Sequence, residues 1–212
     1  NGAGGGSDAK PVSAKDALSA EEREALTLTC AGGQALDPTV CQALDAPAAG
    51  GGGGAPRVTA TPAMALEIAR AKLKLPKPTM GTAPCTGEGC IGRVGVPTWF
   101  WTQAWTSTSV SATAGPHTVT ITAQPSKVVW SLGDGQAVTC TSAGTKYEEW
   151  RGFASSPDCG MPTGYKKMGH YTVTATMTWQ VNWSGAINGS ETMTTSDSAQ
   201  VAIGEVQAVV ER

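Results

Sequence analysis

Residues 171–183 read YTVTATMTWQVNW, and this stretch decides the fold. Its odd-numbered positions are apolar or aromatic, whereas its even-numbered positions hold threonine and then glutamine and asparagine. Successive side chains of a strand point to opposite faces, so this alternation predicts a half-buried β-strand. We expect its odd face to contact a core and its even face to contact water.

Shorter segments on both sides of this stretch have the same character. Residues 117–123, 127–132 and 137–141 read as strands, and residues 200–210 read as a last strand. Residues 184–189, SGAING, are rich in turn formers and are predicted to join two strands.

Composition favours a sheet with one solvated face. Only 15% of the 212 residues are charged, so serine, threonine and glycine supply much of the polarity. The sequence therefore predicts a mainly β protein, with an antiparallel β-sandwich over residues 97–212. This region holds six Lys or Arg against eight Asp or Glu, which excludes a basic surface for nucleic acid.

The N-terminal half divides into three segments. Residues 1–46 are predicted to form a Gly-rich tail and a small helical segment, and residues 47–60 a Gly-rich linker. Residues 61–96 are predicted to supply a helix and a disulfide loop.

Three helix starts can be read from capping residues. Ser19 and Glu22 form a capping-box pattern, in which each side chain satisfies the other residue's backbone N–H. Asp37 before Pro38 and Thr61 before Pro62 combine a capping side chain with proline in the first turn. The helix after Thr61 has one apolar stripe, which is expected to pack on the sandwich or, alternatively, to dock on a partner.

The six cysteines form three pairs that are close in sequence, and an even number of this kind favours disulfides in an oxidising compartment. Reduced buried thiols are the alternative, and zinc is disfavoured because no further ligands lie near the second pair. The expected pairs are Cys30 with Cys41, Cys85 with Cys90, and Cys140 with Cys159.

No apolar stretch is long enough to span a membrane, and the chain starts at Asn1, so we expect an exported mature protein, secreted or at the cell surface.

Gly133, Asp134 and Gly135 predict a tight turn, since glycine tolerates positive φ and the carboxylate can accept from nearby N–H groups. A Ca²⁺ ligand role for Asp134 is the alternative to this structural role. The turn belongs to the sequence WSLGDG at residues 130–135, and GHYTVTA follows at residues 169–175. Together these two motifs resemble the signature of PKD domains, although Leu132 replaces the usual Phe.

This resemblance implies an Ig-like extracellular module that is non-catalytic and contacts proteins or polysaccharides. The segments at 75–78, 94–99, 129–135, 156–159 and 174–179 are also similar to secreted actinobacterial proteins without an assigned activity. Thr163 and the long segment between Cys140 and Cys159 depart from the PKD pattern, which affects the expected strand order more than the sandwich.

Two aromatic clusters are candidate partner-binding surfaces, because binding hot spots favour Trp, Tyr and Arg. One lies at residues 97–105 and the other in the cysteine-flanked loop at residues 141–158. We expect a partner to engage the loop first, since a disulfide would hold it preorganised. The alternative is that these side chains are simply buried. The candidate residues are Trp99, Trp101, Tyr147, Trp150, Arg151 and Phe153.

Catalytic motifs are not found in the sequence. Glu148, Glu149 and Asp158 could form a carboxylate pair for glycoside hydrolysis, but a solvated loop is the expected role. We therefore predict a non-catalytic binding or scaffolding protein without cofactor or metal, whose partner is a protein or a cell-envelope polysaccharide. The alternative is an accessory carbohydrate- or protein-binding module of a secreted hydrolase system.

Overall fold

The computed structural model describes residues 18–33, 38–45, 60–86 and 89–205. They form two compact units. The first, here the helical unit, comprises the described residues up to Lys74 together with Ser109–Thr122 and Asn182–Ser190. The second, the sheet unit, comprises Leu75–Thr108, Ala123–Val181 and the described residues from Glu191 onward.

The helical unit contains α1 (Ala20–Ala31), α2 (Pro38–Asp45) and α3 (Pro62–Lys72). The predicted capping box is confirmed: the Glu22 N–H donates to Ser19 Oγ at 3.2 Å, and the Ser19 N–H donates to the Glu22 carboxylate at 2.8 Å. Thr61 caps α3 by accepting from the Met64 N–H at 3.3 Å. The predicted N-cap Asp37 lies outside the described residues.

Helix α3 is a buried element of the helical unit. Every side chain from Met64 to Ala69 is buried, including Glu67, whose carboxylate lies 3.6 Å from the Arg70 guanidinium. Lys72 reaches Glu21 of α1 at 3.9 Å. A helix buried on this scale has a packing role, so the alternative of a free docking helix is not supported.

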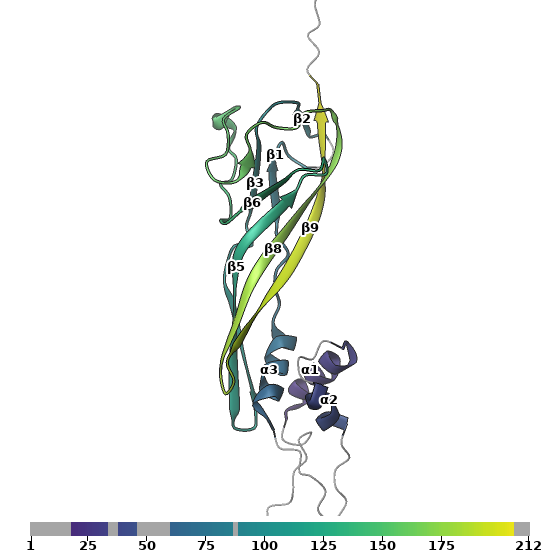
Figure 1. Cartoon of the computed structure of the whole chain (residues 1–212), viewed down its shortest axis with the longest axis vertical. Helices are drawn as coiled ribbons and strands as arrows, with labels where there is room; N and C mark the ends of the chain where they lie inside the picture. The colour runs from purple at the N-terminus through teal and green to yellow at the C-terminus, as the bar shows by residue number, and fades with distance from the viewer. Residues whose placement is uncertain (1–17, 34–37, 46–59, 87–88, 206–212) are drawn as a thin grey trace, which may run out of the picture. The chain divides into compact units, whose positions relative to one another are not determined.

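The strands form two sheets (Figure 1). The three-stranded sheet has the order β1-β3-β7, and the six-stranded sheet has the order β2-β9-β8-β5-β4 with β6 paired to β5. The chain is therefore mainly β, as predicted. The strands are β1 (Met80–Ala83), β2 (Ile91–Arg93), β3 (Thr98–Thr102), β4 (Thr108–Ala114), β5 (His117–Ser131), β6 (Ala137–Cys140), β7 (Gly160–Met161), β8 (Gly169–Gly185) and β9 (Gly189–Gly204).

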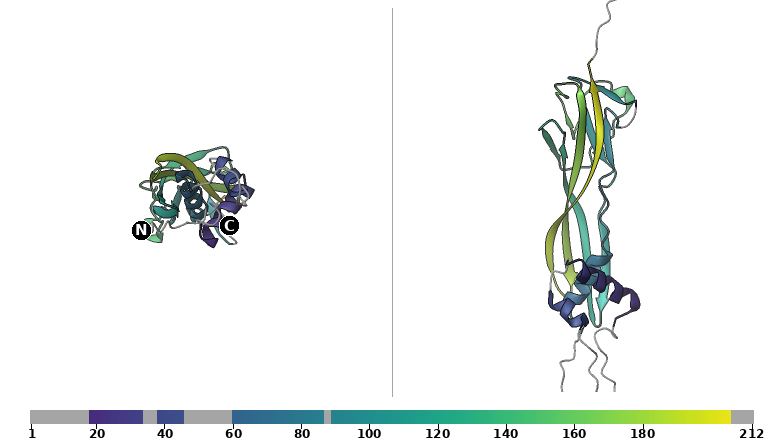
Figure 2. Two further views of the ribbon diagram at one scale, coloured as in Figure 1. Left: turned by 90° about the horizontal axis from the view of Figure 1, so that it is seen from below. Right: turned by 90° about the vertical axis from the view of Figure 1, so that its right-hand side faces the viewer.

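Strand β8 has the predicted alternation, and β9 follows it after a short turn (Figure 2). Strand β5 is continuous where two strands were predicted. Its buried positions change from odd, ending at Ala123, to even, starting at Val128, so the pattern looks broken around Pro125 although the strand continues.

Two short strands before Thr98 were not predicted from the sequence. β1 pairs antiparallel with β3, whereas β2 pairs parallel with β9. β2 lies before residues 97–212, for which the antiparallel sandwich was predicted, so the sheet extends beyond the predicted range and includes one parallel pair. Strands of four and three residues are too short to show an alternation, which explains why the sequence pattern missed them.

Both sheets contribute to the core of the sheet unit. Phe100 of β3 stacks on Trp130 of β5, with ring centroids 5.1 Å apart and planes inclined by 23°. The same cluster contains Met161 of β7, Val173 of β8 and Val201 of β9. The two sheets are therefore packed face to face in this unit.

A turn and a tyrosine lie next to this core. Gly133 and Gly135 have φ of 79° and 89°, and Asp134 accepts from the Gln136 N–H at 2.9 Å. The Tyr165 hydroxyl donates to the Leu132 carbonyl at 3.1 Å. Burial, followed by the negative charge of Asp134, raises the pKa of Tyr165 above its ordinary value.

Candidate functional site

All three predicted disulfides are present: Cys30–Cys41, Cys85–Cys90 and Cys140–Cys159. Free cysteines do not occur among the residues that the structure describes. Three disulfides are typical of proteins in an oxidising, extracellular environment.

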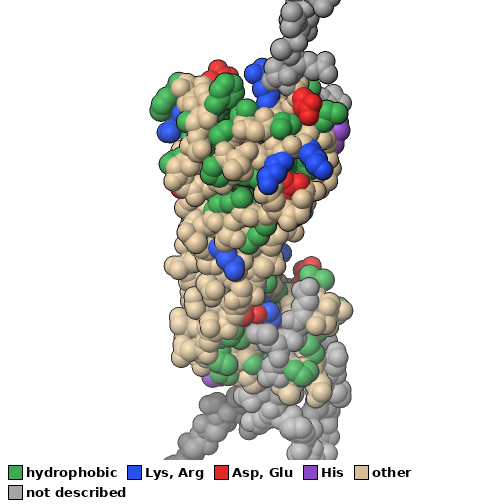
Figure 3. All heavy atoms as spheres, turned by 45° about the horizontal axis from the view of Figure 1, so that its top comes forward, with side chains coloured by type: hydrophobic (Ala, Val, Ile, Leu, Met, Phe, Trp, Pro, Cys, Tyr) green, Lys and Arg blue, Asp and Glu red, His purple; other side chains and the backbone are tan. Residues whose placement is uncertain are grey.

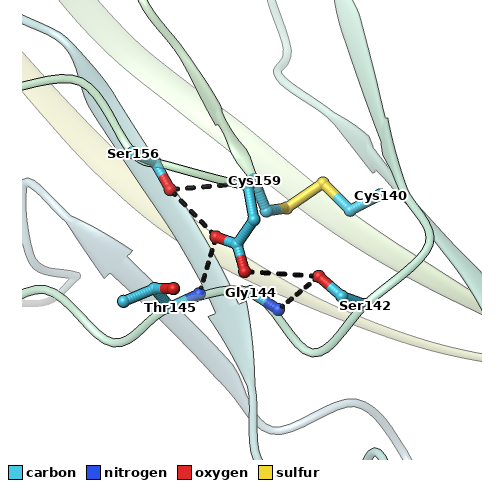
Figure 4. Close-up of a disulfide and its surroundings, with 7 residues drawn as sticks. Cys140, Ser142, Gly144, Thr145, Ser156 and Cys159 are labelled. Carbon is cyan, nitrogen blue, oxygen red and sulfur yellow. Dashed lines mark hydrogen bonds between the residues drawn. A yellow bond between two sulfur atoms is a disulfide. The ribbon is translucent and has the colours of Figure 1, made fainter.

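Asp158 organises the segment between Cys140 and Cys159, here the 140–159 loop. Figure 4 shows the disulfide with Ser142, Thr145 and Ser156 close to it. The Asp158 carboxylate accepts from the Thr145 N–H at 2.9 Å and from the hydroxyls of Ser156 at 3.3 Å and Ser142 at 3.4 Å. Ser156 in turn accepts from the Cys159 N–H. Asp158, considered above as a possible catalytic carboxylate, therefore connects the two ends of the loop next to the disulfide.

The same loop is attached to strand β3. The Thr102 N–H donates to the Ala143 carbonyl at 2.7 Å, and the Trp99 indole N–H donates to the Ala154 carbonyl at 2.7 Å. Gly144 lies so close to β3 that a Cβ there would be 2.3 Å from the Phe100 carbonyl oxygen. The backbone approach thus requires glycine at this position.

Aromatic contacts join the two predicted clusters, at residues 97–105 and 141–158, which are far apart in the sequence. Trp99 meets Tyr147 edge to face at 5.5 Å. The Arg151 guanidinium carbon lies 5.3 Å from the centroid of the Trp99 ring and 4.6 Å from that of the Trp150 ring, within cation–π range of both. Arg151 therefore bridges β3 and the loop.

The candidate aromatic residues differ in accessibility. Trp150 is 75% exposed and Phe153 is 69% exposed, whereas Trp99 is only 1% exposed. Trp99 is therefore covered by the loop and contacts it from the side of β3, whereas Trp150 and Phe153 are accessible to a partner. Tyr147 and Trp101 are half-buried.

A cleft of about 810 Å³ lies beside the loop in the sheet unit. Trp101, Tyr147 and Phe153 supply its aromatic side chains, so three of the six candidate residues line one site. Figure 3 turns the end with β1 and β2 toward the viewer and shows hydrophobic side chains interspersed with acidic and basic ones. The other lining residues are Thr82, Ala83, Pro84, Cys85, Ile91, Gly92, Arg93, Val96, Pro97, Lys146, Glu148, Glu149 and Gly152.

The segments at 82–85 and 91–93 are the part of the site that sequence analysis missed. Ile91 is 69% exposed, which is unusual for a large aliphatic side chain in a strand. Gly92 explains the close packing here, because a Cβ would be 2.3 Å from the Pro84 ring. The Cys85–Cys90 disulfide was the only available signal that this segment is structured.

The charged groups of the cleft lining are balanced in number: Arg93 and Lys146 are basic, and Glu148 and Glu149 are acidic. Glu148 accepts a hydrogen bond from the Trp150 indole N–H, so it also holds an exposed aromatic side chain. Within the described ranges, no group of three or more His, Cys, Asp or Glu is placed to hold a metal ion.

None of the described helices has the length and apolar character needed to cross a lipid bilayer. No family model matches the chain, and comparisons with curated proteins and with solved structures find no significant match either.

Proposed function

We propose that this chain is a non-catalytic binding or scaffolding protein of the extracellular space or cell surface. Its sheet unit is a PKD-like, Ig-like sandwich that offers the cleft beside the 140–159 loop to a partner. That partner is a protein or a cell-envelope polysaccharide.

The observation that carries this proposal is the cleft, whose lining includes three aromatic side chains and two large exposed apolar ones, Phe153 and Ile91. Soluble proteins rarely leave large apolar side chains exposed beside one another without a contact to make. Here Phe153 and Ile91 are each 69% exposed, and both line the cleft. Aromatic side chains in a concave site next to a few charged groups are typical of ligand-binding surfaces.

The loop is also preorganised for binding. Its disulfide, the Asp158 hydrogen bonds and the contact between Arg151 and the buried Trp99 fix its conformation without a partner. A rigid surface loses less conformational entropy on association, so more of the contact free energy appears as affinity.

Export is part of the proposal, and the three disulfides support it. The PKD-like turn at Gly133–Gly135 and the β8 sequence point to the same class of extracellular module. An accessory module of a secreted hydrolase system is the second candidate, favoured by the three aromatic side chains of the cleft, which could stack on sugar rings.

Retention of the folded chain on the cell envelope of its source organism tests the proposal. We expect the double variant Tyr147→Ala/Phe153→Ala to lose retention at least tenfold, while Met168→Ala, which removes a 64% exposed side chain outside the cleft lining, retains the wild-type level. Equal retention of all three proteins, with unchanged melting temperatures, would refute the cleft as the binding site.

Treatment of the envelope separates the partner classes. Retention that survives proteolysis of the envelope indicates a polysaccharide, and retention that proteolysis removes indicates a protein. Turnover of envelope polysaccharide by the purified chain would contradict the non-catalytic assignment.

A further inference from the structure

Strand β2 leaves one of its edges open toward the cleft. It pairs in parallel with β9, with Gly92 opposite Ile203 and Arg93 opposite Gly204. The Val94 N–H donates to the Gly204 carbonyl, and this bond shows which residues of the segment have their backbone groups directed toward β9. In a parallel ladder alternate residues bond to the same neighbour, so Gly92 and Val94 bond to β9.

The backbone groups of the alternate residues, Ile91 and Arg93, therefore point to the opposite side of β2. The N–H and C=O of Ile91 and the N–H of Arg93 are directed away from β9. None of these three groups bonds to another backbone group of the described chain, whereas the Arg93 carbonyl accepts from the Val96 N–H. Among the described residues, this edge thus presents two donors and one acceptor without a backbone partner.

Strand β1 has an open edge at the same cleft. The Phe100 N–H donates to the Cys159 carbonyl, so Phe100 bonds toward β7, and its neighbours Trp99 and Trp101 bond toward β1. By the same alternation, Gly81 and Ala83 bond to β3, and the backbone N–H and C=O of Thr82 point outward.

The lining of the cleft agrees with this geometry. Residues 91, 92 and 93 all line it, and so do residues 82 to 85. A strand viewed on its face would contribute only alternate side chains, whereas a strand viewed along its edge contributes successive residues. The cleft therefore lies beside the segments that carry these outward-directed backbone groups.

We propose that the occupant of the cleft is an extended polypeptide segment that adds to the free edge of β2 as a further strand. The inference rests on the proposed binding function and names its partner class. Outward N–H and C=O groups at residues spaced by two match the backbone of another strand, which has the same repeat. Association by strand addition satisfies backbone groups that are otherwise left to water.

The side chains around β2 define which segment fits. Three backbone hydrogen bonds give modest affinity and do not distinguish one sequence from another. Selectivity must therefore come from the side chains that line the cleft. Phe153, Tyr147 and Trp101 offer apolar contacts to alternate side chains of the incoming strand, and Ile91 adds an apolar contact at the edge itself. We therefore expect a segment with apolar residues at every second position.

The test uses the full chain and 12-residue peptides selected on it from a random phage-displayed library. Arg93→Pro removes the outward N–H of Arg93, and proline is tolerated at an edge position whose N–H faces solvent. Arg93→Ala is the matched control, because it removes the same charge and keeps the N–H. Thermal melting of both variants verifies that the fold is retained.

We expect selected peptides to bind Arg93→Pro up to about tenfold more weakly than Arg93→Ala, the effect of losing one backbone hydrogen bond. Amide hydrogen exchange supplies a second measurement. In the free chain the Gly92 amide should be protected and the Ile91 and Arg93 amides should exchange rapidly, and peptide binding should slow the latter two.

Equal affinity of the two variants, or unchanged exchange at Ile91 and Arg93 in the complex, would overturn strand addition. A selection that returns no cleft-binding peptide would also overturn it. In each case the envelope retention experiment with Tyr147→Ala/Phe153→Ala decides separately whether the proposed binding function stands.

Discussion

Strand β8 and the 140–159 loop place their large side chains in opposite environments. Along β8, Met177 and Trp179 are fully buried and threonine or glutamine faces outward. In the loop, Trp150 and Phe153 are exposed by 75% and 69%. The strand thus uses its large side chains to form a core, whereas the loop presents them to solvent.

The difference shows two ways of fixing a conformation. The strand is held by the burial of its own apolar face, which accounts for most of the stability of a sheet. The loop is held by a disulfide, by the Asp158 hydrogen bonds and by its attachment to Trp99. Because its structure does not depend on burying Trp150 or Phe153, these side chains remain available for a partner.

The largest expected effect is on β8. Trp179→Ala should lower the free energy of unfolding by about 3–5 kcal/mol, because it leaves a cavity and removes the indole hydrogen bond to Thr195. Chemical denaturation measures the change. Gln180→Ala on the exposed face is the control and should change stability by less than about 0.5 kcal/mol. Similar costs for the two variants would contradict the assignment of faces.

Loss of the loop disulfide comes second. Cys140→Ala/Cys159→Ala should cost about 3 kcal/mol on the loop-closure estimate and should also abolish envelope retention. The control is Cys30→Ala/Cys41→Ala, which opens the disulfide of the helical unit. It should lower stability and leave retention intact. Full retention after loss of Cys140–Cys159 would show that preorganisation of the loop is not required.

A smaller effect is expected at Tyr165. Tyr165→Phe removes the hydrogen bond to Leu132 and should cost about 1 kcal/mol at neutral pH. Since burial raises the pKa of Tyr165, the folded state keeps the phenol protonated while the unfolded chain ionises near pH 10. Wild-type stability should therefore fall further above about pH 10 than that of Tyr165→Phe. Parallel alkaline stability curves would contradict this role.

Stability should respond least to the exposed indole. Trp150→Ala is expected to change the free energy of unfolding by less than about 0.5 kcal/mol, because the side chain is mostly solvated. Thermal melting of the variant checks this. A loss comparable to that of Trp179→Ala would mean that the loop is held by burial after all and would remove the contrast between the two regions.

Sequence reasoning succeeded where a pattern repeats. The alternation in β8 spans enough residues to define both faces, and the Ser19–Glu22 capping box is a local interaction that four residues specify completely. Local cysteine pairs likewise predicted all three disulfides.

The site itself was only half visible in the sequence. The hydrogen bond from Trp99 to Ala154 joins residues 55 positions apart, so no local pattern could show that the two aromatic clusters are one structure. Strand β2 has three residues and pairs with the far end of the chain, which leaves no periodic signal. Trp99 was predicted to contact a partner because tryptophan is frequent in binding hot spots, and only the folded structure shows that the loop covers it.

Hydroxyl-radical footprinting of the full chain, free and bound to the envelope, tests the central claim most directly, because it reports the solvent access of individual side chains. The account predicts that Tyr147 and Phe153 lose most of their labelling on binding, while Met168, which is 64% exposed and does not line the cleft, is labelled as in the free chain. Unchanged labelling of Tyr147 and Phe153 in the bound protein, or protection confined to Met168, would contradict it.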